Sequence, residues 1–224
     1  MDGHFLIFVA IVAVVVVAGI FSWLASRQRK KDLAVWAEAH GLQFEEDQFE
    51  GFDTRFPEFD CLCQGSRRYG HNALVGFWNG KGMVAFDYHY RTGSGKNSHD
   101  YNFSAVIMES PVPLRPLFIR PEGFLDKVAT FFGHEDINFE SAEFSRRFYV
   151  RSPDRKWAYD VIHARTMEFL LASPVFTIKF SPTHVIAYRD NRFTPDEFGQ
   201  AADVIGGILD RLPEYLVREQ EGAG

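Results

Sequence analysis

Residues 5–24 form the stretch Phe5-Leu-Ile-Phe-Val-Ala-Ile-Val-Ala-Val-Val-Val-Val-Ala-Gly-Ile-Phe-Ser-Trp-Leu24, in which no side chain is charged and only Ser22 is polar. A helix of this length measures about 30 Å, the thickness of the hydrocarbon core of a bilayer. Buried helices of soluble proteins seldom carry apolar side chains on every face over such a distance. The stretch therefore predicts a transmembrane helix, which makes the lipid bilayer the first expected partner of this chain.

The residues on either side of this stretch predict its orientation. Trp23 and Leu24 close it, and an aromatic side chain at this place is typical of the membrane–water interface. Residues 1–4 contain no Lys or Arg, whereas four basic residues follow the stretch, namely Arg27, Arg29, Lys30 and Lys31. The positive-inside rule then places the basic flank, and the domain behind it, in the cytoplasm. The same four groups could also bind anionic lipid headgroups, which is the alternative to a plain stop-transfer flank.

A cleaved signal peptide is the other interpretation of an apolar N-terminal stretch. It would require a basic segment before the apolar residues, a shorter apolar core, and small residues at the cleavage site. Met1-Asp2-Gly3-His4 is not basic, and the bulky Trp23 and Leu24 occupy the place where cleavage would occur. We therefore expect an uncleaved anchor, beginning at Phe5, in a single-pass protein of the cell membrane.

The composition beyond the anchor is that of a globular domain. The chain has 224 residues, 46% of them hydrophobic and 23 of them Phe, so we expect one domain with a core rich in phenylalanine. A net charge of −6 argues against a nucleic-acid-binding protein, which would normally carry a basic surface. We divide the chain into an anchor (1–26), a juxtamembrane helix (27–41), a single α+β domain (42–217) and a disordered tail (218–224).

Hydrophobic periodicity predicts the elements of that domain. Apolar residues at helical spacing indicate the juxtamembrane helix, and residues 42–60 suggest a short strand and loops. The Asn79–Gly80 pair is typical of a tight hairpin turn between strands 71–78 and 83–91, and a third strand is expected at 99–108. Further elements are a strand at 117–120, helices near 124–132, from Ser152–Pro153 and at 166–172, and strands at 176–180 and 184–188. Thr194-Pro195-Asp196-Glu197 has the form of a capping box with Pro at the first helical position, and predicts the last helix. We expect an α+β fold in which an antiparallel meander sheet is packed by several helices.

Asp87, His89 and His99 are the weak candidates for catalysis. Asp87 and His89 share one face of the second strand, and His99 begins the strand that is expected to return beside it. If His89 and His99 lie close together, the three side chains could hold a divalent metal ion or transfer protons. The alternative is a polar, solvent-facing side of a half-covered sheet.

Two further patterns bear on metal or phosphate binding. Cys61 and Cys63, if on one strand, share a face and are weak metal candidates, but structural zinc requires four ligands and these supply two. Two such cysteines are also too few for a disulfide framework, which fits a reducing compartment. The Gly-rich segment from Thr92 to Ser98 lacks the spacing of a phosphate-binding loop and joins two strands, so we interpret it as a hairpin loop. The sequence therefore predicts no cofactor.

Several stretches together resemble a family of bacterial membrane-anchored proteins. They are Ala73-Leu-Val-Gly76, Val84-Ala-Phe-Asp-Tyr-His-Tyr90, Asp136-Ile-Asn-Phe-Glu-Ser-Ala-Glu-Phe144, Phe148-Tyr-Val-Arg-Ser-Pro-Asp154, and Ala158-Tyr-Asp160 with Met167-Glu-Phe-Leu-Leu171. The family is common in actinobacteria and is known only as a domain of unknown function. The resemblance runs from the anchor to the last helix and implies a bacterial membrane location. It implies no activity and no catalytic residues.

Two hypotheses for the function follow. The first is a non-enzymatic binding or scaffold module on the cytoplasmic face of the membrane, which binds a protein, a peptide or lipid headgroups. It rests on the anchor, the basic flank and the lack of a catalytic motif. The alternative is a metal-assisted or acid–base enzyme that uses Asp87, His89 and His99.

The orientation is tested by fusing reporters after Gly224. A reporter that works only in the cytoplasm should be active, and one that works only outside it should stay silent, because the basic flank resists translocation. The opposite pattern would place the domain outside the cytoplasm.

Overall fold

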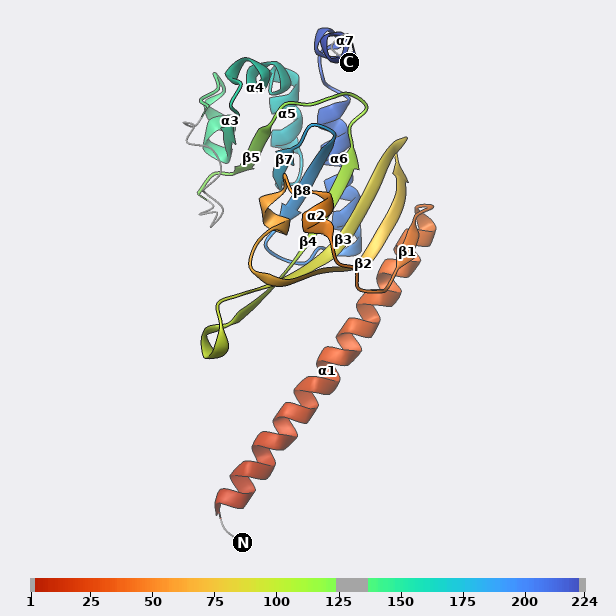
Figure 1. The fold of residues 1–224 in the computed structure, drawn as a ribbon, viewed down its shortest axis with the longest axis vertical. Coiled ribbons are helices and arrows are strands. Elements are labelled where there is room, and N and C mark those ends of the chain that lie inside the picture. The colour runs from red at the N-terminus through yellow and green to blue at the C-terminus, as the bar shows by residue number, and fades with distance from the viewer. Residues whose placement is uncertain (1–2, 124–136, 222–224) are drawn as a thin grey trace.

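A computed structural model gives the fold, and it describes residues 3–123 and 137–221. The sequence-based fold class is confirmed: a long apolar N-terminal helix is followed by an antiparallel sheet packed by helices (Figure 1).

The segments expected to be an anchor and a juxtamembrane helix form one continuous helix, α1 (Gly3–Ala39). Within the described residues, α1 is the one helix that is long and apolar enough to cross a membrane. Its first part projects away from the domain, whereas Leu33, Trp36 and Ala37 near its end are buried (Figure 1). Gly41 follows with a φ of 67°, where Gly avoids the steric cost of a left-handed backbone, and turns the chain into the sheet.

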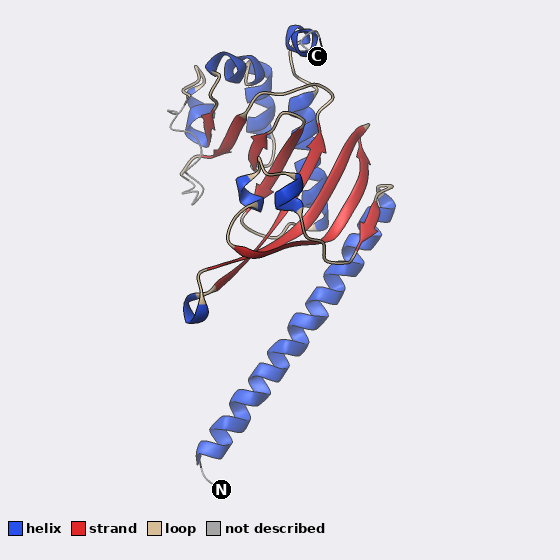
Figure 2. Ribbon diagram, viewed as in Figure 1, coloured by secondary structure: helices blue, strands red, loops and turns tan. Residues whose placement is uncertain are grey.

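The sheet has eight strands in the order β1-β2-β3-β4-β8-β7-β5-β6, and every neighbouring pair is antiparallel (Figure 2). Strands β2, β3 and β4 form the expected meander, but the strand expected at 117–120 does not continue it: it is β5, which lies between β7 and β6, and β4 pairs with β8 instead. The strands are β1 (Gln43–Glu45), β2 (Ser66–Trp78), β3 (Lys81–Thr92), β4 (His99–Glu109), β5 (Leu117–Pro121), β6 (Phe148–Arg151), β7 (Thr177–Phe180) and β8 (His184–Arg189).

Helices cover both faces of this sheet. The 15-residue α6 (Pro195–Leu209) begins with the predicted capping box, in which Thr194 and Glu197 satisfy each other's backbone N–H groups. The remaining helices are α2 (Phe52–Arg55), α3 (Ala142–Arg147), α4 (Arg155–Val161), α5 (Ala164–Ala172), α7 (Glu214–Glu221) and the 3₁₀ turns η1 (Asp60–Leu62) and η2 (Gly95–Asn97).

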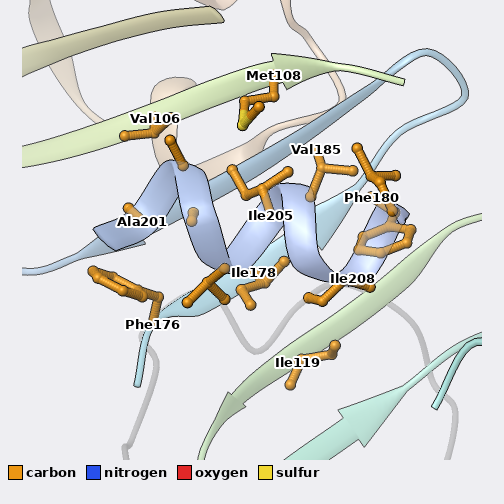
Figure 3. Packing of buried hydrophobic residues seen from close by; sticks show 14 of the residues in the cluster. Val106, Met108, Ile119, Phe176, Ile178, Phe180, Val185, Ala201, Ile205 and Ile208 are labelled. Atoms are coloured by element: carbon orange, nitrogen blue, oxygen red, sulfur yellow. The ribbon is translucent and has the colours of Figure 1, made fainter. Parts of the chain in front are cut away.

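The main core lies between α6 and the strands it crosses (Figure 3). Ala201, Ile205 and Ile208 on α6 face Val106 and Met108 on β4, with Ile178 and Phe180 from β7 and Ile119 from β5 (Figure 3). Residues four apart on a helix share one face, so the apolar spacing of α6 produces this contact. Burial of each valine, isoleucine, methionine or phenylalanine among them stabilises the fold by about 1.5–3 kcal/mol.

The other face of the sheet is covered by the segment between β1 and β2. Phe52, Phe56 and Phe59 pack there against Phe86 and Tyr88 of β3. Side chains alternate along a strand, so β4 contributes Val106 and Met108 to the α6 face and Ala105 and Ile107 to the other. This strand, buried on both faces, is the centre of the fold.

Three expectations about the elements need correction or fall outside the described residues. Helix α4 begins at Arg155 with Asp154 as its N-cap, because Asp154 accepts from the N–H of Trp157 while Ser152 instead donates to the carbonyl of Pro116. Helix α7 includes residues 218–221, where a disordered tail was expected, and its Leu216 is buried. The helix expected near 124–132 lies outside the described residues.

The β2–β3 turn has the geometry that Asn79–Gly80 predicts, with φ of 49° and 78° at the two residues. A β-carbon on Gly80 would meet no atom within 4 Å, so the cost of a side chain there is conformational. We expect Gly80→Val to destabilise the domain by about 1–2 kcal/mol. Thermal unfolding of the purified chain in detergent measures this loss. Asn79→Gly is the matched control and should leave the melting temperature nearly unchanged; equal melting of the wild type and Gly80→Val would contradict the turn.

Candidate functional site

Asp87 lies on the α1 face of β3 and is fully buried. The guanidinium group of Arg29 on α1 donates to both of its oxygens, with Nη2–Oδ1 at 2.6 Å and Nε–Oδ2 at 2.7 Å. Such a bidentate pair fixes both distance and orientation. A basic residue that follows the apolar stretch is therefore the counter-ion of the aspartate that the sequence marked as a catalytic candidate.

Two polar neighbours complete this network around Asp87. Ser104 on β4 donates to Oδ1 at 2.6 Å and accepts from the N–H of Phe193, whose carbonyl in turn accepts from Arg29 Nη1. Asn72 donates to Oδ2 at 2.9 Å from a bulge in β2, where its own φ is 52°. The network joins α1, the strands β2, β3 and β4, and the segment before α6, so it positions α1 on the domain.

The network also determines the protonation of Asp87. Burial alone would raise the pKa of its carboxyl group, but the hydrogen bonds and charge of Arg29, with those of Ser104 and Asn72, hold the pKa below the ordinary value of 3.8. Because this folded-state pKa is depressed, the carboxylate stabilises the fold above the unfolded pKa, and that contribution is lost as the pH falls through the folded pKa. Burial lowers the pKa of the adjacent His71 to about 4, against the opposing charge of Asp87, so His71 is neutral at pH 7.

The structure does not bring His89 and His99 together. In the β3–β4 pairing, His89 lies opposite Asn102 and His99 opposite Thr92. The two histidines are thus three positions apart along the ladder, and an odd offset directs their side chains to opposite faces. His89 instead stacks on Tyr69 and lies 3.4 Å from Asp100. The expected Asp87–His89–His99 constellation is wrong, and the enzyme hypothesis loses its geometric basis.

The cysteines do not share a face either. They lie at the 3₁₀ turn η1 rather than on a strand, so Cys61 is buried while Cys63 is exposed, and both carry reduced thiols. Burial, with the nearby Asp53 and Asp60, raises the pKa of Cys63 and so disfavours the thiolate that would bind a metal. Among residues 3–123 and 137–221, no group of three or more His, Cys, Asp or Glu side chains could hold a metal ion.

The four basic residues after the apolar stretch have different roles. Arg29 binds Asp87. The Nζ atom of Lys30 lies 2.6 Å from Oε1 of Glu46, the residue that directly follows β1. Arg27 lies over the ring of Trp23 at 4.4 Å, and Lys31 is exposed. Two of the four basic residues, for which headgroup binding was the alternative to a plain stop-transfer flank, thus dock the domain on α1.

A groove of about 550 Å³ opens on the face of the sheet opposite α1. Phe49, Phe52 and Phe56 form one wall of the groove. Phe77, near the end of β2, belongs to the opposite wall, and its side chain is 73% exposed. Phe49 pairs with Gly70 through two backbone hydrogen bonds of 2.9 Å, and its ring occupies the space where a β-carbon on residue 70 would lie. Glycine at that position therefore allows the wall to pack on β2.

The rim of the groove is acidic. Glu45, Glu50 and Glu109 line it, and within the described chain none of the three has a salt bridge to a basic side chain. Arg55 is the one basic side chain in the lining. Burial lowers the pKa of His184, partly offset by the charge of Glu109, and so disfavours a positive charge on this histidine. Three carboxylates therefore face one guanidinium around a groove with phenylalanine walls.

Sequence reasoning missed this groove. Its signal was present in the spacing of Phe49, Phe52, Phe56 and Phe59, which recurs at three and four residues as on a helix face. Four-residue α2 is too short for that periodicity to be decisive, and residues 42–60 were expected to be a strand and loops.

The Arg29–Asp87 pair can be tested by a double-mutant cycle. Arg29→Met keeps the length of the side chain but leaves a buried carboxylate without its counter-ion, and we expect a loss of about 3–5 kcal/mol. Adding Asp87→Asn removes that charge while the amide can still meet Ser104, so the double variant should be more stable than Arg29→Met alone. Thermal unfolding of the full chain in detergent measures the stability of the single and the double variant. A double variant less stable than Arg29→Met would contradict the pairing.

Comparisons with known proteins give one informative neighbour. No protein-family profile matches the sequence, and no curated protein is significantly similar to it. The structure is similar to the crystal structure of the mycobacterial trehalose monomycolate transport factor A, TtfA, with a TM-score of 0.60 and 14% sequence identity. The match covers 83% of this chain and 95% of TtfA, so the two share the fold.

Proposed function

We propose that this chain is a membrane-anchored, non-enzymatic binding module whose domain faces the cytoplasm and whose groove binds a basic, partly apolar segment of a membrane protein. The observation that carries the proposal is the groove itself, which combines the exposed side chain of Phe77 and the partly buried ring of Phe49 with three glutamates on its rim. Large aromatic side chains supply most of the affinity at protein interfaces, and surrounding charges select the partner.

The location of the domain supports the choice of partner. An anchor would confine the groove to the neighbourhood of a membrane, where proteins embedded in it are within reach. The cytoplasmic segments next to their transmembrane helices are enriched in Lys and Arg. A groove rimmed by Glu45, Glu50 and Glu109 is complementary to such segments. The similar protein TtfA is a transport factor, which agrees with a module that acts on another membrane component.

The arrangement of the domain separates anchoring from binding. Helix α1 and α6 occupy one face of the sheet, and the groove lies on the other. A partner can therefore enter the groove without displacing the Arg29–Asp87 pair.

The proposal predicts selective binding of peptides by the full-length protein in detergent. A labelled peptide that alternates Lys with Leu should bind, whereas a Glu–Leu peptide and a Lys–Ser peptide should not, as measured by fluorescence anisotropy. Phe77→Ser should weaken binding by about tenfold or more, the effect of removing an interface anchor. Glu45→Gln, Glu50→Gln and Glu109→Gln together should weaken it several-fold and reduce its salt dependence.

Val35→Ser provides the matched control. Val35 is 67% exposed but lies on α1, away from the groove, so its replacement should leave binding unchanged. Equal binding of the Lys–Leu and Glu–Leu peptides, or equal effects of the Phe77 and Val35 variants, would overturn the groove as the binding site.

A further inference from the structure

The β3–β4 hairpin extends toward the same side of the domain as the apolar part of α1 (Figure 1). Two contacts establish this direction independently of the view. Arg29 on α1 binds Asp87 on β3, and Trp36, further along α1, stacks on Trp78, which pairs with Lys81 at the other end of β3. Moving back along α1 from Trp36 to Arg29 therefore means moving along β3 toward the hairpin tip.

The same two contacts indicate how far the tip reaches. From Lys81 to Asp87 the strand advances about 20 Å, while from Trp36 to Arg29 the helix advances about 10 Å. The five further residues from Asp87 to Thr92 add about 17 Å of strand. The end of β3 therefore lies beyond the Arg29–Asp87 contact, on the side of the apolar stretch.

The tip has the chemistry of the lipid headgroup region. Residues 92–99 are Thr, Gly, Ser, Gly, Lys, Asn, Ser and His, all polar or small, and Lys96 is exposed with no salt bridge in the described chain. A β-carbon on Gly93 would lie 2.2 Å from the carbonyl oxygen of Asn97, so glycine there allows the compact turn. The exposed Arg67 lies beside the same end, since its neighbour Ser66 pairs with Arg91.

We propose that the tip of the β3–β4 hairpin is a second membrane contact, in which Lys96 and Arg67 bind the phosphates of anionic lipid headgroups beside α1. This rests on the proposed membrane span, though not on the side that the domain faces. A Lys or Arg near an anionic surface favours contact by about fivefold each. A single helix leaves the tilt and rotation of its domain unrestrained, whereas a helix and a hairpin that both meet the bilayer fix the height at which the groove is held.

Lipid quenching of a fluorescent amino acid in the full-length protein tests the contact. The probe replaces Ser94 in the tip, Thr183 in the exposed β7–β8 turn, or Val15 within α1. Thr183 is the matched control, because the β4–β8 pairing places it at the opposite end of β4. Each variant is reconstituted in vesicles of phosphatidylcholine and phosphatidylglycerol that contain a lipid spin-labelled either in its headgroup or deep in its acyl chain.

We expect the headgroup label to quench position 94, the acyl-chain label to quench position 15, and neither to quench position 183. If position 15 is quenched while position 94 behaves like 183, the hairpin contact is wrong and the anchor stands. If position 15 is not quenched, the anchor fails, and the hairpin contact fails with it. Lys96→Glu with Arg67→Glu should reduce the quenching at position 94 in anionic vesicles. Unchanged quenching would show that headgroup phosphates do not hold the tip, and the proposal would be overturned.

Discussion

The buried ion pair between Arg29 and Asp87 is the constraint on which the arrangement of the molecule depends. A carboxylate with no exposed surface cannot remain ionised in a sheet unless a counter-ion and hydrogen-bond donors surround it. Arg29 supplies that charge from α1, and α1 has no break between the apolar stretch and its end at Ala39. The direction of the apolar half is therefore fixed by the contacts of the other half. A buried pair of this kind adds little net stability against an apolar substitute, so its role here is to specify the register and rotation of the helix.

The same constraint separates the two faces of the sheet. With α1 docked, its Trp36 stacks on Trp78 of β2. The indole N–H of Trp36 donates to Asp196 of α6, and that of Trp78 donates to Asp203. The α1–α6 side is thereby closed by a packed core and by hydrogen bonds. On the other side a short segment with its phenylalanine residues covers the centre of the sheet but not the ends of β2 and β3, where the groove lies. One face of the sheet holds α1, and the other remains accessible at the groove.

Sequence signals that act within a few residues predicted the fold well. The apolar stretch, the Asn79–Gly80 turn and the Thr194–Glu197 capping box each carry their own physical reason, and each element is found. The failures involve residues whose meaning depends on distant ones. Asp87 was a catalytic candidate because no local pattern links it to its partner. That partner is Arg29, 58 positions earlier, in the basic flank of the apolar stretch. His99 was misplaced because a loop of uncertain length sets the register, and one position of slippage changes the face. The groove forms only because α2 lies over β2, and no local sequence pattern predicts that placement.

A fold shared at 14% identity is determined by the pattern of apolar residues rather than by particular side chains. Core positions such as Ile205 can accept other apolar residues of similar volume, and they indicate nothing about function. Side chains that the fold does not require need a different explanation. The docking of α1 explains Asp87. An exposed Phe77 forgoes about 2 kcal/mol of burial, and three carboxylates around one groove repel each other. Both features are unfavourable in the isolated domain and would become favourable if a basic, apolar segment covered them, which supports the groove as the proposed binding site.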